Sequence, residues 1–159
     1  METAYGQNNC RDLMKLEQNF GFRSCFNFVP ERYEVSEILQ NELLSNRFEI
    51  GVHGLNHDGR LYQSEKIFKK RALKINQYLH EWNAVGFISP AMHYNLDLLN
   101  DLNIEYDMST FDTDPFEPQS DGVGTVFPFW IQGSPDHKGY QELPYTLPQD
   151  FTLFVLIKY

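Results

Sequence analysis

The sequence predicts an α/β fold whose sheet is mainly parallel. Two observations lead to this prediction: short apolar segments alternate with segments of helical periodicity, and glycine, proline or a capping residue marks the ends of several of them. Repeats of this kind place ligand sites in the loops at the carboxyl ends of the strands. With 159 residues, the chain can bury one core but is short for two ordinary domains, so a single domain over residues 1–159 is expected.

The amino-terminal third contains two helical and two strand patterns. An apolar stripe at helical spacing covers residues 11–20 and ends at a glycine. Alternating aromatic residues over 22–30 stop at a proline and predict a strand. A helical pattern over 36–46 is followed by an apolar strand pattern over 48–53.

The middle of the chain continues the same alternation. A long helix is expected from about residue 64 to residue 82, and the apolar segment 85–90 predicts a third strand. Residues 95–103 form a helical pattern with Asn95 as its cap. Residues 105–112 predict a fourth strand.

Beyond residue 110 the sequence becomes aromatic and rich in proline. Strands are predicted there at 124–130, 140–144 and 152–159. The last pattern has no helix or polar tail after it, and the first helix has no strand before it. Because an uncovered apolar strand would expose a sheet edge, we expect the sequence to be part of a longer gene product.

The composition argues against several classes of function. Thirteen basic and twenty-two acidic residues give a net charge of −9, which disfavours nucleic acid and anionic membrane surfaces and suits a neutral or cationic ligand. No apolar run reaches the ~18–20 residues of a membrane span, and no signal-peptide pattern is present, so a soluble chain, cytoplasmic by default, is expected. Cys10 and Cys25 lack the spacing of a zinc site and are predicted to be buried apolar side chains.

His53 and His57 lie four residues apart, directly after the strand pattern 48–53. Two histidines at this spacing can converge on one metal ion, with each nitrogen about 2.0–2.1 Å from it. The alternative is a pair of loop residues that hydrogen-bond locally. A catalytic zinc site also needs a third protein ligand, and glycine at position 54 excludes the zincin H-E-x-x-H motif.

Two sequence blocks around these histidines resemble the polysaccharide deacetylase (NodB-homology, carbohydrate esterase) family. They read EIGVHGLNHDG at 49–59 and GFISPAMHYN at 86–95; the family carries H-[ST]-x-x-H after one barrel strand and R-x-P after the next. A bacterial branch of the family is similar over nearly the whole chain, also in the blocks FNFVPE, FDTDPFEPQ and ELPYTLPQD. The resemblance implies a distorted or incomplete (β/α) barrel and metal-dependent hydrolysis of an acetamide on a sugar.

The resemblance also implies a metal site made of His53, His57 and a carboxylate. In the branch, an acidic motif on the first strand reads D-V-E, and Glu2 matches its final acid; a solvated terminal side chain is the alternative. Zinc is the expected cofactor, with iron, cobalt or nickel as alternatives, because imidazole and carboxylate suit all of them. Two neighbouring residues are candidates to fix the imidazole tautomers, Asn56 and Asp58.

The loops after the third and fourth strands are expected to hold the substrate. The candidate substrate-binding residues are Pro90, His93, Asp112 and Asp114. Three aromatic side chains are candidates for a wall on which a pyranose stacks: Phe111, Phe116 and Trp130. The alternative is that this segment is a turn in which Asp-Pro redirects the chain.

Several positions depart from the family pattern. Ile88 replaces the arginine of R-x-P, which removes a bidentate charge partner for the catalytic acid, and Gly54 replaces the usual Ser or Thr. The motif that supplies a general-acid histidine would lie beyond Tyr159, and His137 does not match it. The chain is thus expected to lack the family's first strand and carboxyl-terminal part, and loss of each proton-transfer group typically costs about 10² to 10⁴ in rate.

Three functions follow as alternatives. The first is a metal-dependent hydrolase that removes N-acetyl groups from a sugar of a surface polysaccharide or its precursor. The second is an amidase with the same fold that acts on a small non-peptide amide. The third is a catalytically degenerate, carbohydrate-binding or truncated product. A long open groove would favour the glycan, and a closed pit would favour the small amide.

Overall fold

A six-stranded sheet forms the centre of the computed structural model, which describes residues 1–112, 122–133, 135, 137–147 and 151–158. The strand order is β1-β2-β3-β4-β6-β5, and every neighbouring pair is parallel except β5 with β6. The strands are β1 (Cys25–Phe28), β2 (Glu49–His53), β3 (Gly86–Ile88), β4 (Tyr106–Asp107), β5 (Phe129–Gln132) and β6 (Gly139–Glu142). Within the described residues β1 and β5 are open edges, so the sheet fits the expected incomplete barrel.

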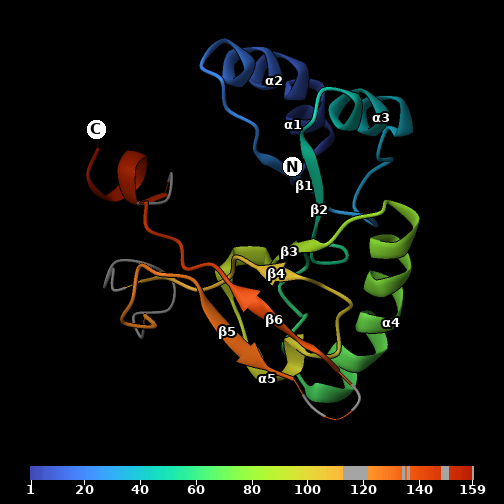
Figure 1. Ribbon diagram of the computed structural model, residues 1–159, viewed down its shortest axis with the longest axis vertical. Helices are drawn as coiled ribbons and strands as arrows, with labels where there is room; N and C mark the ends of the chain where they lie inside the picture. Colours follow the sequence, from blue (N-terminus) through green and yellow to red (C-terminus); the bar gives the residue numbers. More distant parts are fainter. Residues whose placement is uncertain (113–121, 134, 136, 148–150, 159) are drawn as a thin grey trace.

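Most of the helices lie at the two ends and along one side of this sheet (Figure 1). Three gather at the β1–β2 end, α4 runs along one side, and α5 lies near β5 and β6. The α-helices are α1 (Ala4–Asn8), α2 (Cys10–Asn19), α3 (Glu37–Ser45), α4 (Glu65–Glu81) and α5 (Leu96–Leu99). Two shorter turns complete the elements, the 3₁₀ turn η1 (Pro90–Met92) and the π-helical turn η2 (Phe151–Leu156). No helix in the described part of the chain is long and apolar enough to cross a membrane.

Side-chain caps explain where the longer helices begin. Ser36 and Ser64 each accept a hydrogen bond from the backbone N–H three residues later, at 3.3 Å. Asn95 does the same for Leu98 at 3.1 Å. Each cap satisfies one of the N–H groups that a helix start leaves without a partner. The predicted cap at Asn95 is confirmed, and the long helix predicted over 64–82 is confirmed to within one residue at each end.

The core forms two clusters on the helix side of the sheet. One packs β1 and β2 against α2 and α3, and the other packs β2, β3 and β6 against α4 and α5. Along β2 the alternating residues Ile50 and Val52 are buried in these clusters. Because successive side chains of a strand point to opposite faces, His53 then points away from the helix layer. The alternation that builds the core therefore also directs this histidine toward the open face of the sheet.

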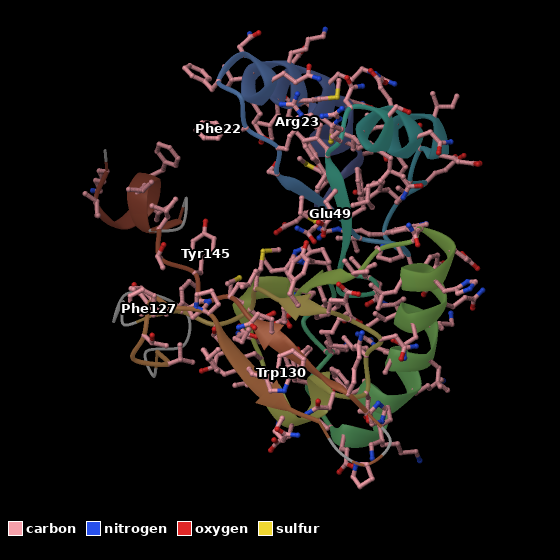
Figure 2. All side chains as sticks on the ribbon, in the orientation of Figure 1. Phe22, Arg23, Glu49, Phe127, Trp130 and Tyr145 are labelled. Atoms are coloured by element: carbon pink, nitrogen blue, oxygen red, sulfur yellow. The ribbon has the colours of Figure 1, made fainter. Side chains whose placement is uncertain are left out.

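The predicted stripe on α2 is mostly exposed. Of its apolar residues Met14 is buried, whereas Leu13, Leu16 and Phe20 are 39%, 53% and 69% exposed. Cys10, at the start of the helix, is also buried. Phe22, directly after this helix, also projects from the surface (Figure 2). A short amphipathic helix at the end of the sheet buries one narrow face, so the other apolar positions of the stripe remain in solvent. The prediction that both cysteines are buried holds for Cys10, while Cys25 is half-buried.

The carboxyl-terminal strand predictions are partly wrong. Residues 152–158 do not continue the sheet, and η2 occupies residues 151–156 instead. Without a neighbouring strand, a segment satisfies its backbone groups by local turns. The strand predicted at 124–130 starts only at Phe129, because Pro128 cannot donate to a ladder.

Candidate metal site

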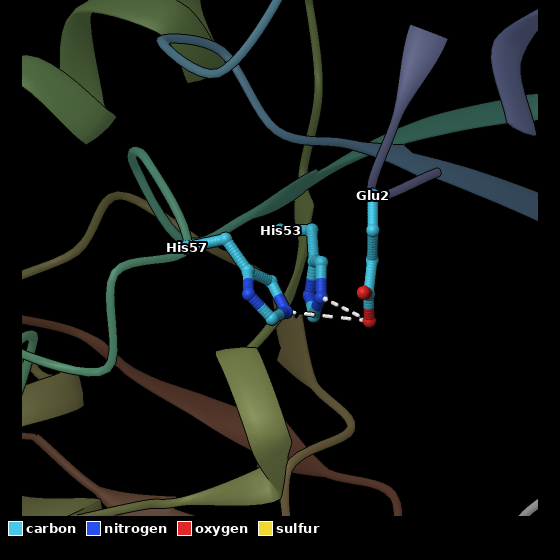
Figure 3. Close-up of side chains that lie close together, drawn as sticks. All are labelled: Glu2, His53 and His57. Atoms are coloured by element: carbon cyan, nitrogen blue, oxygen red, sulfur yellow. Dashed lines mark ion pairs between the residues drawn. The ribbon is translucent and has the colours of Figure 1, made fainter. Parts of the chain in front are cut away.

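Three side chains converge at the carboxyl end of β2. His53 is the last residue of β2, His57 lies in the following turn, and Glu2 comes from the segment before α1. The Oε1 atom of Glu2 lies 3.3 Å from Nε2 of His57 and 3.6 Å from Nε2 of His53 (Figure 3). All three ligand atoms lie within 4.8 Å of one another, so the group can hold a metal ion.

A backbone carbonyl sets the orientation of His53. The Nδ1 atom of this side chain lies 2.9 Å from the carbonyl oxygen of Ile88, on the neighbouring strand β3. A carbonyl oxygen only accepts hydrogen bonds, so Nδ1 carries the proton and Nε2 carries the lone pair. That lone pair faces Glu2 and His57, as a metal ligand requires.

His57 completes the group from a tight turn. Its backbone has φ = 53°, a left-handed conformation that is uncommon for a residue other than glycine. Its Nε2 atom is buried and makes no hydrogen bond within the described residues, although Glu2 lies at ion-pair distance. When both imidazoles carry their proton on Nδ1, as a shared metal ion requires, two nitrogen lone pairs and a carboxylate face one another without a donor between them. A cation relieves that arrangement, so the donor set fits a divalent metal.

The segment that carries Glu2 is anchored to the rest of the fold. The amino group of Met1 donates to the carbonyl oxygen of Asn27 on β1, and Tyr33 donates to the carbonyl oxygen of Met1 at 2.5 Å. Thr3 then caps α1. The two histidine side chains lower the pKa of Glu2 to about 2, and His53 has the larger effect. Glu2 is therefore a carboxylate throughout the physiological pH range.

The structure gives a physical reason for glycine at position 54. Gly54 has φ = +63°, and a Cβ atom built on it would lie 2.3 Å from Cγ of Pro90. Pro90 is buried in η1 and fills the space that a side chain at 54 would need. The predicted substrate residue Pro90 thus packs against the turn between the two histidines.

Replacing Gly54 with serine is expected to destabilise the fold by about 2–5 kcal/mol. About 1–2 kcal/mol comes from the left-handed backbone, and about 1–3 kcal/mol comes from overpacking against Pro90. Urea unfolding measures the change. Gly59→Ser is the matched control, because Gly59 also has positive φ (+71°) but has nothing within 4 Å of its Cβ position; equal losses in the two variants would show that Pro90 exerts no steric effect.

Two cavities adjoin the three ligands. One, of about 430 Å³, is lined by Glu2, His53 and Tyr145 among others. The second, of about 330 Å³, is lined by His57 and by the predicted substrate residue His93. Tyr145 was not among the residues singled out in the sequence, although it lies within the block ELPYTLPQD. Its ring makes an edge-to-face contact with the ring of Phe111, with 5.9 Å between the two ring centroids.

The other predicted aromatic and acidic residues lie elsewhere. Phe111 is 1% exposed and belongs to the core, so it cannot stack on a sugar. Trp130 is exposed on the edge strand β5, well separated from Tyr145 in Figure 2, and lines neither cavity. Asp112 also lines neither cavity, and its N–H donates to the carbonyl oxygen of Tyr145 at 3.2 Å. The two remaining predictions lie outside the described residues, Asp114 and Phe116.

Neither residue proposed to fix the imidazole tautomers has that role. Asp58 forms a bidentate ion pair with Arg71 on α4, with N–O distances of 2.6 and 2.7 Å, which lowers the pKa of Asp58 to about 2. Asn56 has a buried Oδ1 without a hydrogen-bond partner among the described residues. The backbone carbonyl of Ile88 fixes the tautomer of His53 instead, because β3 lies directly beside β2.

Comparison with known proteins supports the fold. No family model matches the chain, and none of the curated proteins matches it. Among solved structures, the chain is similar to a crystal structure described as a "putative polysaccharide deacetylase" from Mycobacterium smegmatis, with a TM-score of 0.60 and 20% sequence identity. The match covers 84% of this chain and 44% of that chain, so the present chain spans less than half the length of its structural neighbour. The likeness confirms the predicted fold class.

Proposed function

We propose that this chain carries the metal-binding part of a hydrolase that removes N-acetyl groups from a sugar of a surface polysaccharide or its precursor. The observation that carries the proposal is the convergence of Glu2, His53 and His57 at the carboxyl end of a parallel sheet. This is the edge at which open α/β sheets bind ligands. The structural neighbour is described as a "putative polysaccharide deacetylase", which agrees with this proposal.

We propose that the resident metal is zinc. Two neutral imidazoles and one carboxylate form one of the ligand sets found in catalytic zinc sites, which leave a further position open; iron, cobalt and nickel accept the same ligands. When bound, such a metal activates water and polarises a carbonyl. His53 contributes a lone pair whose direction is fixed by Ile88, and Glu2 contributes the negative charge.

The two cavities support an extended substrate. Glu2 and His53 line one of them and His57 lines the other, so the metal group borders both. A glycan can lie across the group, whereas a small amide would need a single closed pit. Tyr145 offers an aromatic side chain in the larger cavity, where one face of a pyranose can pack.

A second candidate function is carbohydrate binding without catalysis. Ile88 favours it, because its side chain lines the larger cavity at the position where the family resemblance would place an arginine. An aliphatic side chain cannot pair with a catalytic carboxylate. The amidase on a small amide remains the third alternative.

Acetate release from an oligomer of N-acetylglucosamine tests the proposed function. The zinc-loaded chain is expected to release acetate slowly, because Ile88 stands where the family resemblance places an arginine. His57→Ala is expected to reduce the rate by a further factor of about 10², because a metal supplies several kcal/mol of transition-state stabilisation. Binding of the oligomer in calorimetry without acetate release would favour the carbohydrate-binding candidate. Hydrolysis of a small acetamide without release from the oligomer would favour the amidase.

A further inference from the structure

The peptide unit between Ile88 and Ser89 is held at both ends. Its carbonyl oxygen accepts the hydrogen bond from Nδ1 of His53 at 2.9 Å. Its N–H donates to Oγ of Ser109 at 2.8 Å, and Ser89 and Ser109 are both fully buried. Because the two groups belong to one rigid planar unit, the position of Ser109 determines where the carbonyl oxygen can lie relative to His53.

Asp107 in turn holds Ser109. The N–H of Ser109 donates to Oδ2 of Asp107 at 2.9 Å, and its hydroxyl donates to Oδ1 at 2.7 Å. A hydroxyl has one hydrogen, so once that hydrogen is given to Asp107 the lone pairs of Oγ remain for the N–H of Ser89. Asp107 therefore fixes the Ser109 hydroxyl, the one group between itself and the Ile88–Ser89 peptide unit whose hydrogen-bond direction can vary.

Glu142 fixes Asp107 from the neighbouring strand. Asp107 on β4 and Glu142 on β6 are register partners, and both are fully buried. Their carboxyl groups lie close enough for each to shift the pKa of the other. Thr110 donates its N–H and its hydroxyl to Oε1 of Glu142, at 3.1 and 2.7 Å. Burial raises the pKa of both acids, which favours a protonated carboxyl in the pair.

We propose that Asp107 is a positioning residue for His53, acting through Ser109 and the Ile88–Ser89 peptide unit. Direct carboxylate–histidine–metal contacts fix the tautomer of many metal-binding histidines. Here a serine and a peptide unit extend that contact across two strands, and each hydrogen bond polarises the next. The consequence for metal affinity rests on the proposed function, whereas the effect on the tautomer of His53 requires no metal.

The tautomer of His53 in the metal-free protein tests the inference. For the neutral ring, nitrogen-15 NMR of the side chain is expected to show the Nδ1–H form predominating. Ser109→Ala is expected to populate the Nε2–H form to a comparable extent, because the peptide unit, once its N–H has lost the acceptor, can turn its carbonyl oxygen away from Nδ1. Ser109→Thr restores the hydroxyl and is expected to restore the shifts. Asp107→Asn, which retains the volume of the side chain, is a second test in case Ser109→Ala fails to fold.

Tyr140→Phe is the matched control for a general loss of packing. It removes a hydroxyl from the same core, where Tyr140 donates to the carbonyl oxygen of Leu96 at 2.9 Å, but does not touch the Ile88–Ser89 peptide unit. This variant is expected to leave the His53 shifts unchanged. Unchanged shifts in both Ser109→Ala and Asp107→Asn would overturn the inference.

Zinc affinity separates this inference from the proposed function. If the chain binds zinc, Ser109→Ala is expected to weaken binding by about 10- to 100-fold, as for other partners that support metal-binding histidines. An altered tautomer in a chain that binds no zinc would support the positioning role and contradict the proposed function. Zinc binding with the same affinity and the same tautomer in wild type and Ser109→Ala would contradict the positioning role alone.

Discussion

His53→Ala is expected to abolish stable zinc binding. The variant removes one of three ligands and also the hydrogen bond to Ile88. Loss of a residue that only supports a ligand costs about 10- to 100-fold in affinity, so loss of the ligand itself should cost more than about 100-fold. Competition with a chromogenic chelator measures the affinity, and metal analysis after dialysis measures the stoichiometry.

His93→Ala is the matched control for the metal experiment. His93 lines the smaller cavity together with His57 but does not belong to the group of three ligands. It should retain zinc at wild-type affinity. If the wild-type chain retains no more zinc than His53→Ala after dialysis, the proposed metal site is wrong.

Local sequence patterns predicted the positions of the helices and strands better than their ends. The periodicity of residues 64–82 spans α4, because Ser64 caps its start and the helix ends before Trp82. The strand patterns were longer than the strands. Residues 85–90 contain Ser89 and Pro90, which leave the ladder after Ile88 and build the η1 turn instead. An apolar pattern therefore locates a strand but does not give its ends.

The histidine pair was visible in the sequence, whereas its supporting contacts were not. His53 and His57 share a spacing, and the resemblance added Glu2. The carbonyl of Ile88 carries no sequence signal, because every residue has one and its use depends on which strands lie side by side. The predicted partner Asp58 was wrong because a closer charge on α4, Arg71, binds it.

The burial of Asp107 and Glu142 could not be predicted from the sequence without knowledge of the sheet topology. Asp107 ends the short strand β4, and Glu142 ends β6, with β5 between these two strands in the sequence. From the sequence alone, each would be predicted to be an exposed polar residue beside a strand. Acidic residues are almost never fully buried unless they are paired. Asp107 and Glu142 are paired because β4 and β6 are neighbours in the sheet, and no local sequence pattern predicts that these two strands pair.

Glu142→Ala is expected to destabilise the fold by about 2–6 kcal/mol, because it leaves two buried donors of Thr110 without an acceptor at about 1–3 kcal/mol each. The N–H and hydroxyl of Thr110 would lose their acceptor, and Asp107 would lose its partner. Urea unfolding measures the change. Glu105→Ala is the control, because its exposed ion pair with Lys138 at 4.0 Å should contribute less than about 0.5 kcal/mol.

The same pair is expected to make stability fall as the pH rises from about 4. Both acids have a raised pKa in the folded chain, whereas in the unfolded chain they lose their protons near the ordinary values of about 3.9 and 4.3. Above those values the folded state holds a proton that the unfolded state has lost. The free energy of unfolding then decreases by about 1.4 kcal/mol per pH unit for each such proton, until the pair itself ionises.

The double variant Asp107→Asn with Glu142→Gln isolates this contribution. It removes both titrating groups while nearly preserving their volumes and their capacity for hydrogen bonds. Its stability relative to wild type should therefore increase between pH 4 and pH 7. Parallel stability curves for the two proteins would mean that the buried acids share no proton, and that Asp107 faces Ser109 as a plain carboxylate with both oxygens accepting.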